Sequence, residues 1–257
     1  MSEPELLYEV RDRVGWITIN REARRNALSP AMIDLFLGYL AEAESDDNVR
    51  VICLTAAGEK VFCSGADLAG GLSEGGVAAG AQKYATLLKK LAHLSKPLVA
   101  RVNGHCLAGG MGLMLSCDMV YAADGATFGT PEVKVGLFPM MIGALIFRNA
   151  GRKKALEMIY TARTLSAAEA EEMGLITRAV PSENLDRVVN DTLAAVAAKA
   201  PLAIKLGRQA LAAVEGQPLD EALDYLCEQL AIVVATEDAA EGMTAFIQKR
   251  EPTWKGR

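Results

Sequence analysis

Two short glycine-bearing segments could do chemistry through their backbone. They read CSGADL (63–68) and LAGGMG (107–112), and each follows a strand-like apolar run. Small residues let a ligand approach main-chain amides, and the second segment opens a predicted helix whose first amides lack partners within the helix. Amides near Ala66 and Gly109 could therefore converge on one oxygen and stabilise negative charge that develops there. Glycine-rich strand-to-helix turns also occur for close packing, so spacing alone leaves both interpretations open.

The composition narrows the class of partner. The 257 residues carry a net charge of -5, and the lysines and arginines are scattered, so nucleic acid is not expected to bind. The longest near-apolar stretch, residues 135–147, contains Pro139 and is too short to cross a bilayer. The first ten residues lack the layout of a secretory signal. We expect a cytoplasmic protein that does not enter a membrane.

The five cysteines are odd in number and show no paired spacing of metal ligands. They are Cys53, Cys63, Cys106, Cys117 and Cys227. Most stand in apolar surroundings, so we interpret them as small buried hydrophobic residues and expect no metal site.

The first 140 residues alternate between strand and helix patterns. A hairpin is predicted over 6–20 with its turn near residues 13–15, and the next helix opens with Ser29 as its cap and Pro30 in its first turn. Further strands are predicted at 49–56, 97–104, 119–123 and 126–130, with helices at 81–94 and 109–118. Alternation of this kind is typical of a stacked α/β core.

The chain becomes mostly helical after Met140. We divide it into a core over 1–195 and a helical region over 196–257. The helical region is interpreted as an element that oligomerises and closes a pocket rather than as an independent domain.

Six longer motifs are more specific than the glycine spacing. They are RRNAL (24–28), VFCSGADL (61–68), VNGHCLAGGMGLMLSCDMVYA (102–122), FGTPEVKVGLFP (128–139), GRKKALEMIYTARTLSAAEAEEMGLI (151–176) and EGMTAFIQKREP (241–252). Together they resemble the crotonase superfamily, the enoyl-CoA hydratase and isomerase family, over nearly the whole chain. The resemblance implies an α/β fold with a ββα spiral core and a C-terminal helical oligomerisation region. It also implies a homotrimer or homohexamer that acts on an acyl-CoA thioester, with coenzyme A as part of the substrate and no separate cofactor.

The resemblance assigns roles to individual residues. It implies that the amides of Ala66 and Gly109 hold the thioester oxygen in an oxyanion hole. The implied CoA contacts are Arg24, Arg25 and Ala27 near the nucleotide, Ser64, Asp67 and Leu68 along the pantetheine arm, and Phe246 and Lys249 at carboxy-terminal positions that often reach CoA in a neighbouring subunit. A solvated surface charge is the alternative interpretation of Lys249.

Glu132 matches one of the two glutamates that hydratases of this family use, whereas Gly112 stands at the position of the other. Hydration needs a water molecule held by two acceptors and a proton delivered to carbon 2, work that the two carboxylates share. A single carboxylate can still take a proton from carbon 2 and return it at carbon 4, as in a Δ3,Δ2-enoyl-CoA isomerase. We therefore expect an isomerase with Glu132 as its only acid/base, its pKa raised by apolar surroundings.

Two other functions remain open. The nearest is enoyl-CoA hydratase activity that uses a different second group. The other is an acyl-CoA-binding protein with little catalysis, since loss of a catalytic side chain with retention of the binding backbone would produce one. A hydrolase or dehalogenase would need a nucleophilic carboxylate where the sequence offers none.

Three further features need an interpretation. Residues 139–147 (PMMIGALIF) replace a glycine-rich segment followed by Thr-Gln-Arg in many hydratases, and they are interpreted either as a wall of an acyl pocket or as core packing. His105 is expected to hydrogen-bond to backbone rather than act on a substrate. Asp118 is expected to satisfy backbone groups at a helix end.

Overall fold

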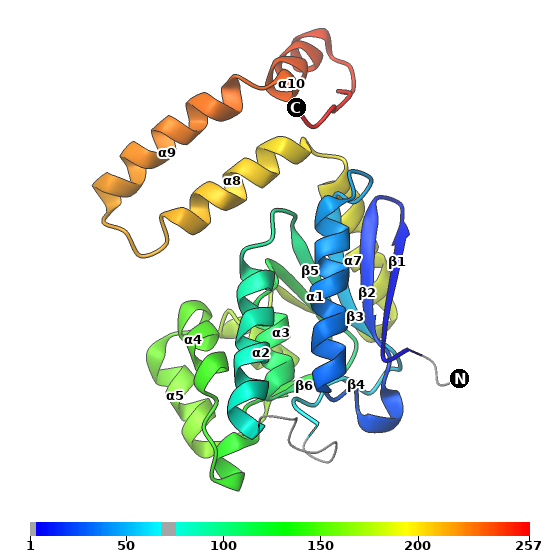
Figure 1. The fold of residues 1–257 in the computed structure, drawn as a ribbon, viewed down its shortest axis with the longest axis vertical. Helices are drawn as coiled ribbons and strands as arrows, with labels where there is room; N and C mark the ends of the chain where they lie inside the picture. The colour runs from blue at the N-terminus through cyan, green and yellow to red at the C-terminus, as the bar shows by residue number, and fades with distance from the viewer. Residues whose placement is uncertain (1–3, 68–75) are drawn as a thin grey trace.

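The chain begins with a β-hairpin that forms the edge of the larger of two sheets (Figure 1). The computed structural model describes residues 4–67 and 76–257. Strands β1 (Leu6–Arg11) and β2 (Val14–Ile19) pair antiparallel, as the sequence predicted. Their turn is made by Asp12 and Arg13, both with positive φ (51° and 64°). The turn therefore lies slightly earlier in the chain than the predicted residues 13–15, because Val14 and Gly15 already belong to β2.

The strands form two sheets. The six-stranded sheet has the order β1-β2-β3-β5-β7-β10, with β3 (Val51–Ala56), β5 (Leu98–Val102), β7 (Met119–Ala123) and β10 (Arg178–Val180). The four-stranded sheet has the order β4-β6-β8-β9, with β4 (Val61–Cys63), β6 (His105–Leu107), β8 (Thr127–Gly129) and β9 (Leu165–Ser166). Pairing is parallel from β2 to β10 and from β4 to β8, and β9 pairs antiparallel with β8.

The chain repeats one unit of two strands and a helix. Each of β3, β5 and β7 lies in the large sheet, and the strand that follows it lies in the small one. Helix α2 (Gly76–Ala92) follows β4, and α3 (Gly109–Leu115) follows β6. This repetition is the expected ββα spiral, and it brings the ends of β4, β6 and β8 to one place.

Helix α1 (Pro30–Ser45) shows how the local sequence fixes an element. Ser29 caps it, since its hydroxyl oxygen accepts a hydrogen bond from the Met32 amide at 3.1 Å, and Pro30 occupies the first turn.

The 3-10 turns are η1 (Glu22–Arg24), η2 (Pro131–Val135) and η3 (Ser182–Asn184), and the remaining helices of the core are α4 (Met140–Asn149), α5 (Arg152–Thr161), α6 (Ala167–Glu172) and α7 (Leu185–Ala197).

Two apolar clusters cover the two faces of the large sheet. The main cluster packs α1, α2 and α3 against one face and includes Phe36, Leu87 and Met111. The second lies under α7, whose Val189 and Leu193 pack near Trp16. Burial on both faces explains why all six residues of β3 are buried and why its sequence lacks polar alternation.

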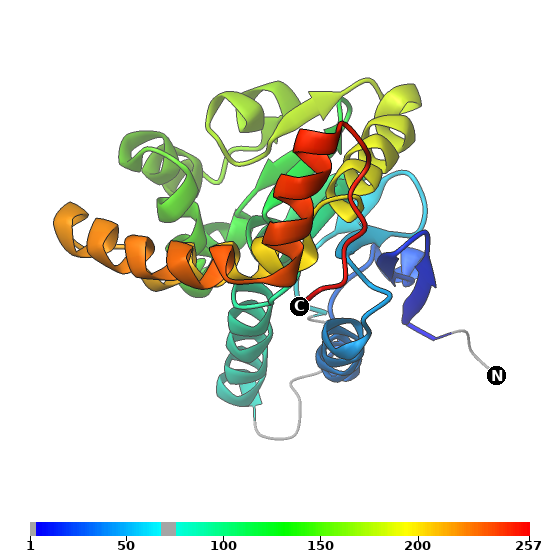
Figure 2. The same ribbon diagram turned by 90° about the horizontal axis from the view of Figure 1, so that it is seen from above.

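Helices α8 (Pro201–Ala213), α9 (Leu219–Val234) and α10 (Glu237–Gln248) complete the chain. Figures 1 and 2 both show α9 extending beyond the core. No residue of α9 is buried, and its apolar side chains Leu219, Leu223, Leu230 and Ile232 are at least half exposed. The predicted helices are thus present, whereas the short strands β4, β6, β9 and β10 were missed because two or three residues carry no periodicity.

Within the described residues, no helix is both long enough and apolar enough to span a membrane.

Candidate active site

The loop after β4 presents the amide of Ala66. Leu28 N donates to Gly65 O at 2.8 Å and Asp67 N donates to Leu28 O at 2.9 Å, which makes a parallel bridge between Leu28 and Ala66. In a parallel bridge the N–H groups of successive residues point to opposite sides. The Asp67 N–H points toward Leu28, so the Ala66 N–H points away from it. Ala66 is exposed, and its amide is therefore available to a ligand.

The loop after β6 brings the amide of Gly109 to the same place. Ala108 N donates to Gly129 O at 2.9 Å, and α3 begins at Gly109. A Cβ built on Gly109 would lie 3.6 Å from Ala66 N, and one built on Gly65 would lie 3.1 Å from Gly109 N. The two loops are in contact, so the amides of Ala66 and Gly109 are neighbours.

The glycines around this turn serve close approach. A Cβ on Gly104 would lie 2.3 Å from Lys60 C, and one on Gly110 would lie 2.5 Å from Cys63 O. Real Cβ atoms do not come this close to backbone. The packing interpretation of the turn therefore holds, because packing of bare backbone is what joins the two loops.

Glu132 lies just after β8, the strand whose last residue, Gly129, accepts the hydrogen bond from Ala108 N. It lies in η2, three residues after Gly129. Burial raises the pKa of its carboxyl above the usual value, and its Oε2 atom is buried with no hydrogen-bond partner in the part of the chain that the structure describes. An unsatisfied buried carboxylate oxygen is costly, which makes it suited to take up a proton.

Gly112 lies on the first turns of α3, and the space beside it is filled by Tyr84 of α2. A Cβ on Gly112 would lie 2.1 Å from the Tyr84 hydroxyl oxygen. That hydroxyl donates to Gly109 O at 2.5 Å, and the Tyr84 side chain is buried. The pKa of Tyr84 lies well above its usual value. Burial is the main cause, and the charge of Glu132 is one of the smaller causes.

Sequence reasoning missed Tyr84, although a signal was present. Tyr84, Leu87, Leu88 and Leu91 recur at the spacing of one helical face, and all four are buried. Tyr84 is the member of that face with a polar group, which is the kind of residue that needs a partner when buried.

Asp67 forms an ion pair with Arg21. Its Oδ2 atom lies 2.9 Å from Arg21 Nη2, and both side chains are largely buried. Arg21 also donates to Ala27 O at 2.6 Å and lies 2.7 Å from Glu5 Oε1. The pair therefore ties the loop that carries Ala66 to the segment before α1.

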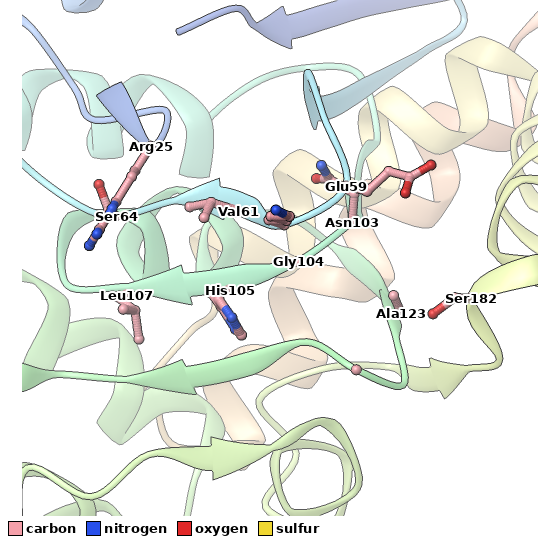
Figure 3. Close-up of a pocket in the computed structure, with 12 residues that line it drawn as sticks. Arg25, Glu59, Val61, Ser64, Asn103, Gly104, His105, Leu107, Ala123 and Ser182 are labelled. Atoms are coloured by element: carbon pink, nitrogen blue, oxygen red, sulfur yellow. The ribbon is translucent and has the colours of Figure 1, made fainter. Parts of the chain in front are cut away.

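Two of the residues matched to CoA contacts, Arg25 and Ser64, line one cavity of about 470 Å³. Figure 3 shows both at one end of this cavity and Ser182 at the other. Leu107, two residues before Gly109, is also part of its wall. The wall of the cavity therefore includes residues from the segment before α1 and from β4 and β6, whereas Ala66 and Gly109 are not among the residues that line it.

The other residues matched to CoA contacts are dispersed. Arg24 is exposed, Ala27 is buried, and Leu68 lies outside the described residues. Phe246, 85% exposed, and Lys249 lie on and just after α10, at the far end of the molecule from β4 and β6 (Figure 1). One copy of the chain does not bring these two residues to the site.

The remaining candidates have structural partners. His105 shares a 2.7 Å hydrogen bond with the Thr127 hydroxyl, so the expectation of a backbone partner was wrong. Asp118 accepts from Leu98 N at 2.7 Å, as expected, and pairs with Arg208 at 2.9 Å.

The cysteines and the apolar segment divide between core and surface. Cys53, Cys63 and Cys106 are buried, as expected, and Cys227 is exposed. In α4, Ile142 and Ile146 belong to the core, whereas Met140 and Phe147 are exposed, so residues 139–147 serve core packing in part.

Known proteins share both this fold and this sequence pattern. Residues 9–257 match the enoyl-CoA hydratase/isomerase family. The chain is 34% identical over 258 residues to the probable enoyl-CoA hydratase echA8 of Mycobacterium bovis, with all of both chains covered, and 33% identical to the 2,3-dehydroadipyl-CoA hydratase of Escherichia coli, covering 98% of this chain and 99% of that one. The crystal structure of an enoyl-CoA hydratase from Bacillus anthracis superposes with a TM-score of 0.95 at 33% identity, covering 99% of this chain and all of the other. With its ββα spiral and its two joined amide loops, this chain is an enzyme that belongs to the enoyl-CoA hydratase/isomerase family.

Proposed function

We propose that the protein is an enoyl-CoA isomerase that moves a double bond from the 3,4 to the 2,3 position of an acyl-CoA. One observation carries the proposal: Glu132 has a raised pKa and an unpartnered oxygen, and its charge acts on Tyr84, whose hydroxyl donates to Gly109 O, while the position of a second carboxylate is the bare Gly112. One carboxylate suffices for a proton shift but not for the shared work of hydration.

The amides of Ala66 and Gly109 would receive the thioester oxygen. Glu132 takes a proton from carbon 2, and the electron pair of that C–H bond delocalises onto the thioester oxygen as a dienolate. Two amide donors stabilise that charge, and each is worth about 3–4 kcal/mol of barrier in comparable sites. The Glu132 carboxyl then returns its proton to carbon 4, and the double bond ends between carbons 2 and 3.

The raised pKa of Glu132 suits both half-reactions. A carboxylate with an ordinary pKa would be a weak base toward carbon 2. Burial makes the carboxylate more basic while keeping its proton transferable, which is the condition for a group that acts as base and then as acid.

Hydration is the second candidate, because the similar proteins from Mycobacterium bovis and Escherichia coli are named hydratases. Because residue 112 is a glycine, hydration would require a group elsewhere in the site to hold the water molecule. The two reactions share the amide pair and Glu132, so the products must decide between them.

The CoA moiety would lie along the cavity that Arg25 and Ser64 line, and its nucleotide would meet Phe246 and Lys249 from a second copy of the chain. The support for assembly is the row of exposed apolar side chains on α8 to α10, which includes Leu211, Leu230 and Ile247. Residues 196–257 would then act as the oligomerising region of a trimer or hexamer.

The test offers the purified protein a 3-enoyl-CoA and, separately, a 2-enoyl-CoA. Double-bond migration without hydration, reduced at least about 10³-fold by Glu132→Gln, is the expected result. The control Glu183→Gln changes an exposed glutamate of η3 and should leave the rate unchanged. Rapid hydration that needs Glu132 would favour the second candidate, and binding without either reaction would indicate a protein that only holds acyl-CoA.

A further inference from the structure

Tyr84 and Gly112 compete for one volume between α2 and α3. A Cβ at residue 112 would lie 2.1 Å from the Tyr84 hydroxyl oxygen, 3.1 Å from its Cζ and 3.4 Å from Leu88 Cδ2. Contacts below 3.0 Å are not found for real Cβ atoms. Any side chain at residue 112 therefore requires Tyr84 to move, and Tyr84 requires a glycine there.

The Tyr84 hydroxyl is held in this volume by its hydrogen bond to Gly109 O, at 2.5 Å. Gly109 belongs to the proposed amide pair, and a Cβ built on it would lie 3.6 Å from Ala66 N. The aromatic ring is 8% exposed and packs among core residues of α2 and α3. Tyr84 thus braces one half of the amide pair as well as filling the space.

The hydroxyl is chemically different from a carboxylate. Burial, and among the nearby charges that of Glu132, raises the pKa of Tyr84 well above 10, so the group stays protonated at neutral pH. Its proton is already committed to Gly109 O. A protonated phenol in this position cannot act as the second base that activates water.

We propose that Tyr84 is a specificity-determining residue that occupies the volume of a second carboxylate and its water, and so confines the site to proton transfer by Glu132. This inference rests on the proposed isomerase function. It explains why Gly112 and Tyr84 occur together in this chain. The glycine leaves a space beside α3, and the tyrosine of α2 fills that space.

The first experiment measures the coupling without any assay of activity. Melting temperatures are compared for the wild type, Gly112→Ala, Tyr84→Phe and the double variant. Gly112→Ala should lower the melting temperature by several degrees in the wild-type background and by less than about half as much beside Tyr84→Phe, because the atom 2.1 Å away is then absent. Additive changes would overturn the inference.

The second experiment measures the ratio of hydration to isomerisation with the two enoyl-CoA substrates. Tyr84→Ala opens the volume, and the double variant Tyr84→Ala with Gly112→Glu supplies a carboxylate to it. We expect the ratio to rise at least about 10-fold in the double variant and to stay at the wild-type value in Tyr84→Phe, which keeps the ring. A folded double variant whose ratio stays within twofold of the wild type would overturn the inference.

Leu88→Ala is the matched control. It removes volume from the same face of α2, one turn away, and keeps Tyr84 in place. It should lower the melting temperature without changing the ratio, and a rise equal to that of the double variant would show that any cavity admits water and would overturn the role of Tyr84.

The two proposals fail in different ways. A wild-type protein that does not isomerise a 3-enoyl-CoA, but whose melting temperatures show the coupling, would sink the proposed function and leave the mutual exclusion of Tyr84 and residue 112 standing. Isomerisation by the wild type together with additive melting temperatures would sink only the role of Tyr84.

Discussion

The two halves of the proposed site, the amide donors and the acid/base, are built by opposite means. The donor half consists of backbone amides held by several contacts, among them the bridge from Leu28 to Ala66 and the hydrogen bond from Ala108 N to Gly129 O. The acid/base half depends on Glu132, whose Oε2 atom lacks a partner among the described residues. One half is fixed by packing, and the other is left unsatisfied for reaction.

This difference separates what the fold supplies from what individual side chains supply. The proposed amide donors depend on the ββα spiral, because β4 and β6 pair side by side and bare backbone lets the loops after them touch. The choice of reaction depends instead on which side chains face those amides. A family can therefore keep the donor half and change its chemistry at a few positions.

The sharpest way to break the donor half is Gly109→Ala. The new methyl group would meet its neighbours at 3.4–3.6 Å, an ordinary contact distance, so the protein should fold. The methyl group would however lie 3.6 Å from Ala66 N, in the space that the proposed mechanism gives to the thioester oxygen. We expect kcat/KM for isomerisation to fall about 10²–10³-fold, the loss typical of one missing donor.

The control for this variant is Gly38→Ala, on the exposed face of α1 with nothing within 4 Å of the added Cβ. It should leave kcat/KM unchanged. An unchanged rate in Gly109→Ala, measured with a folded protein, would show that the thioester oxygen binds elsewhere.

An intermediate effect is expected from loosening the support of the donor half. Asp67→Asn removes the charge that holds Arg21 at 2.9 Å in a largely buried pair. A weakened buried contact of this kind costs about 1–3 kcal/mol, and we expect kcat/KM to fall about 10-fold as the loop of Ala66 gains freedom. Thermal unfolding and initial rates measure the two effects.

The exposed pair of Arg187 and Asp191, 3.5 Å apart, supplies the matched control. Asp191→Asn should change stability by less than about 0.5 kcal/mol and leave the rate alone. Equal effects of the two substitutions would mean that the Asp67 pair does not support the site.

Different parts of the structure were predictable to different degrees. The hairpin, the cap at Ser29 and the buried strand β3 follow from local periodicity and capping chemistry, so they could be predicted. Strand β10 could not, since its pairing with β7 is decided by the spiral and not by its three residues.

The same distinction holds within the site. Glycines at 109 and 110 predicted an approach of bare backbone, because glycine is costly in a helix and small residues let other groups come close to the main chain. The approach of Tyr84 to Gly112 could not be predicted, since it depends on how α2 packs on α3 and no sequence spacing encodes that contact.

The smallest expected effect concerns the stability of the acid/base half. Burial raises the folded-state pKa of Glu132 above its usual 4.5, so the folded protein binds this proton more tightly than the unfolded chain does. The stability of the wild type therefore decreases as the pH rises from below 4.5 through the raised pKa. Glutamine has no proton to lose, so Glu132→Gln should melt on the order of 2 °C higher than the wild type at neutral pH.

The pH dependence of that difference tests its cause. The gap between Glu132→Gln and the wild type should be largest at neutral pH and should shrink as the pH falls below the raised pKa and then below 4.5, where the carboxyl becomes protonated in both the folded and the unfolded chain. The exposed control Glu183→Gln should show a difference near zero at every pH. A gap that stays constant with pH would mean that the gain comes from new amide hydrogen bonds and not from removal of an unsatisfied charge, and the contrast between a satisfied donor half and an unsatisfied acid/base half would then fail.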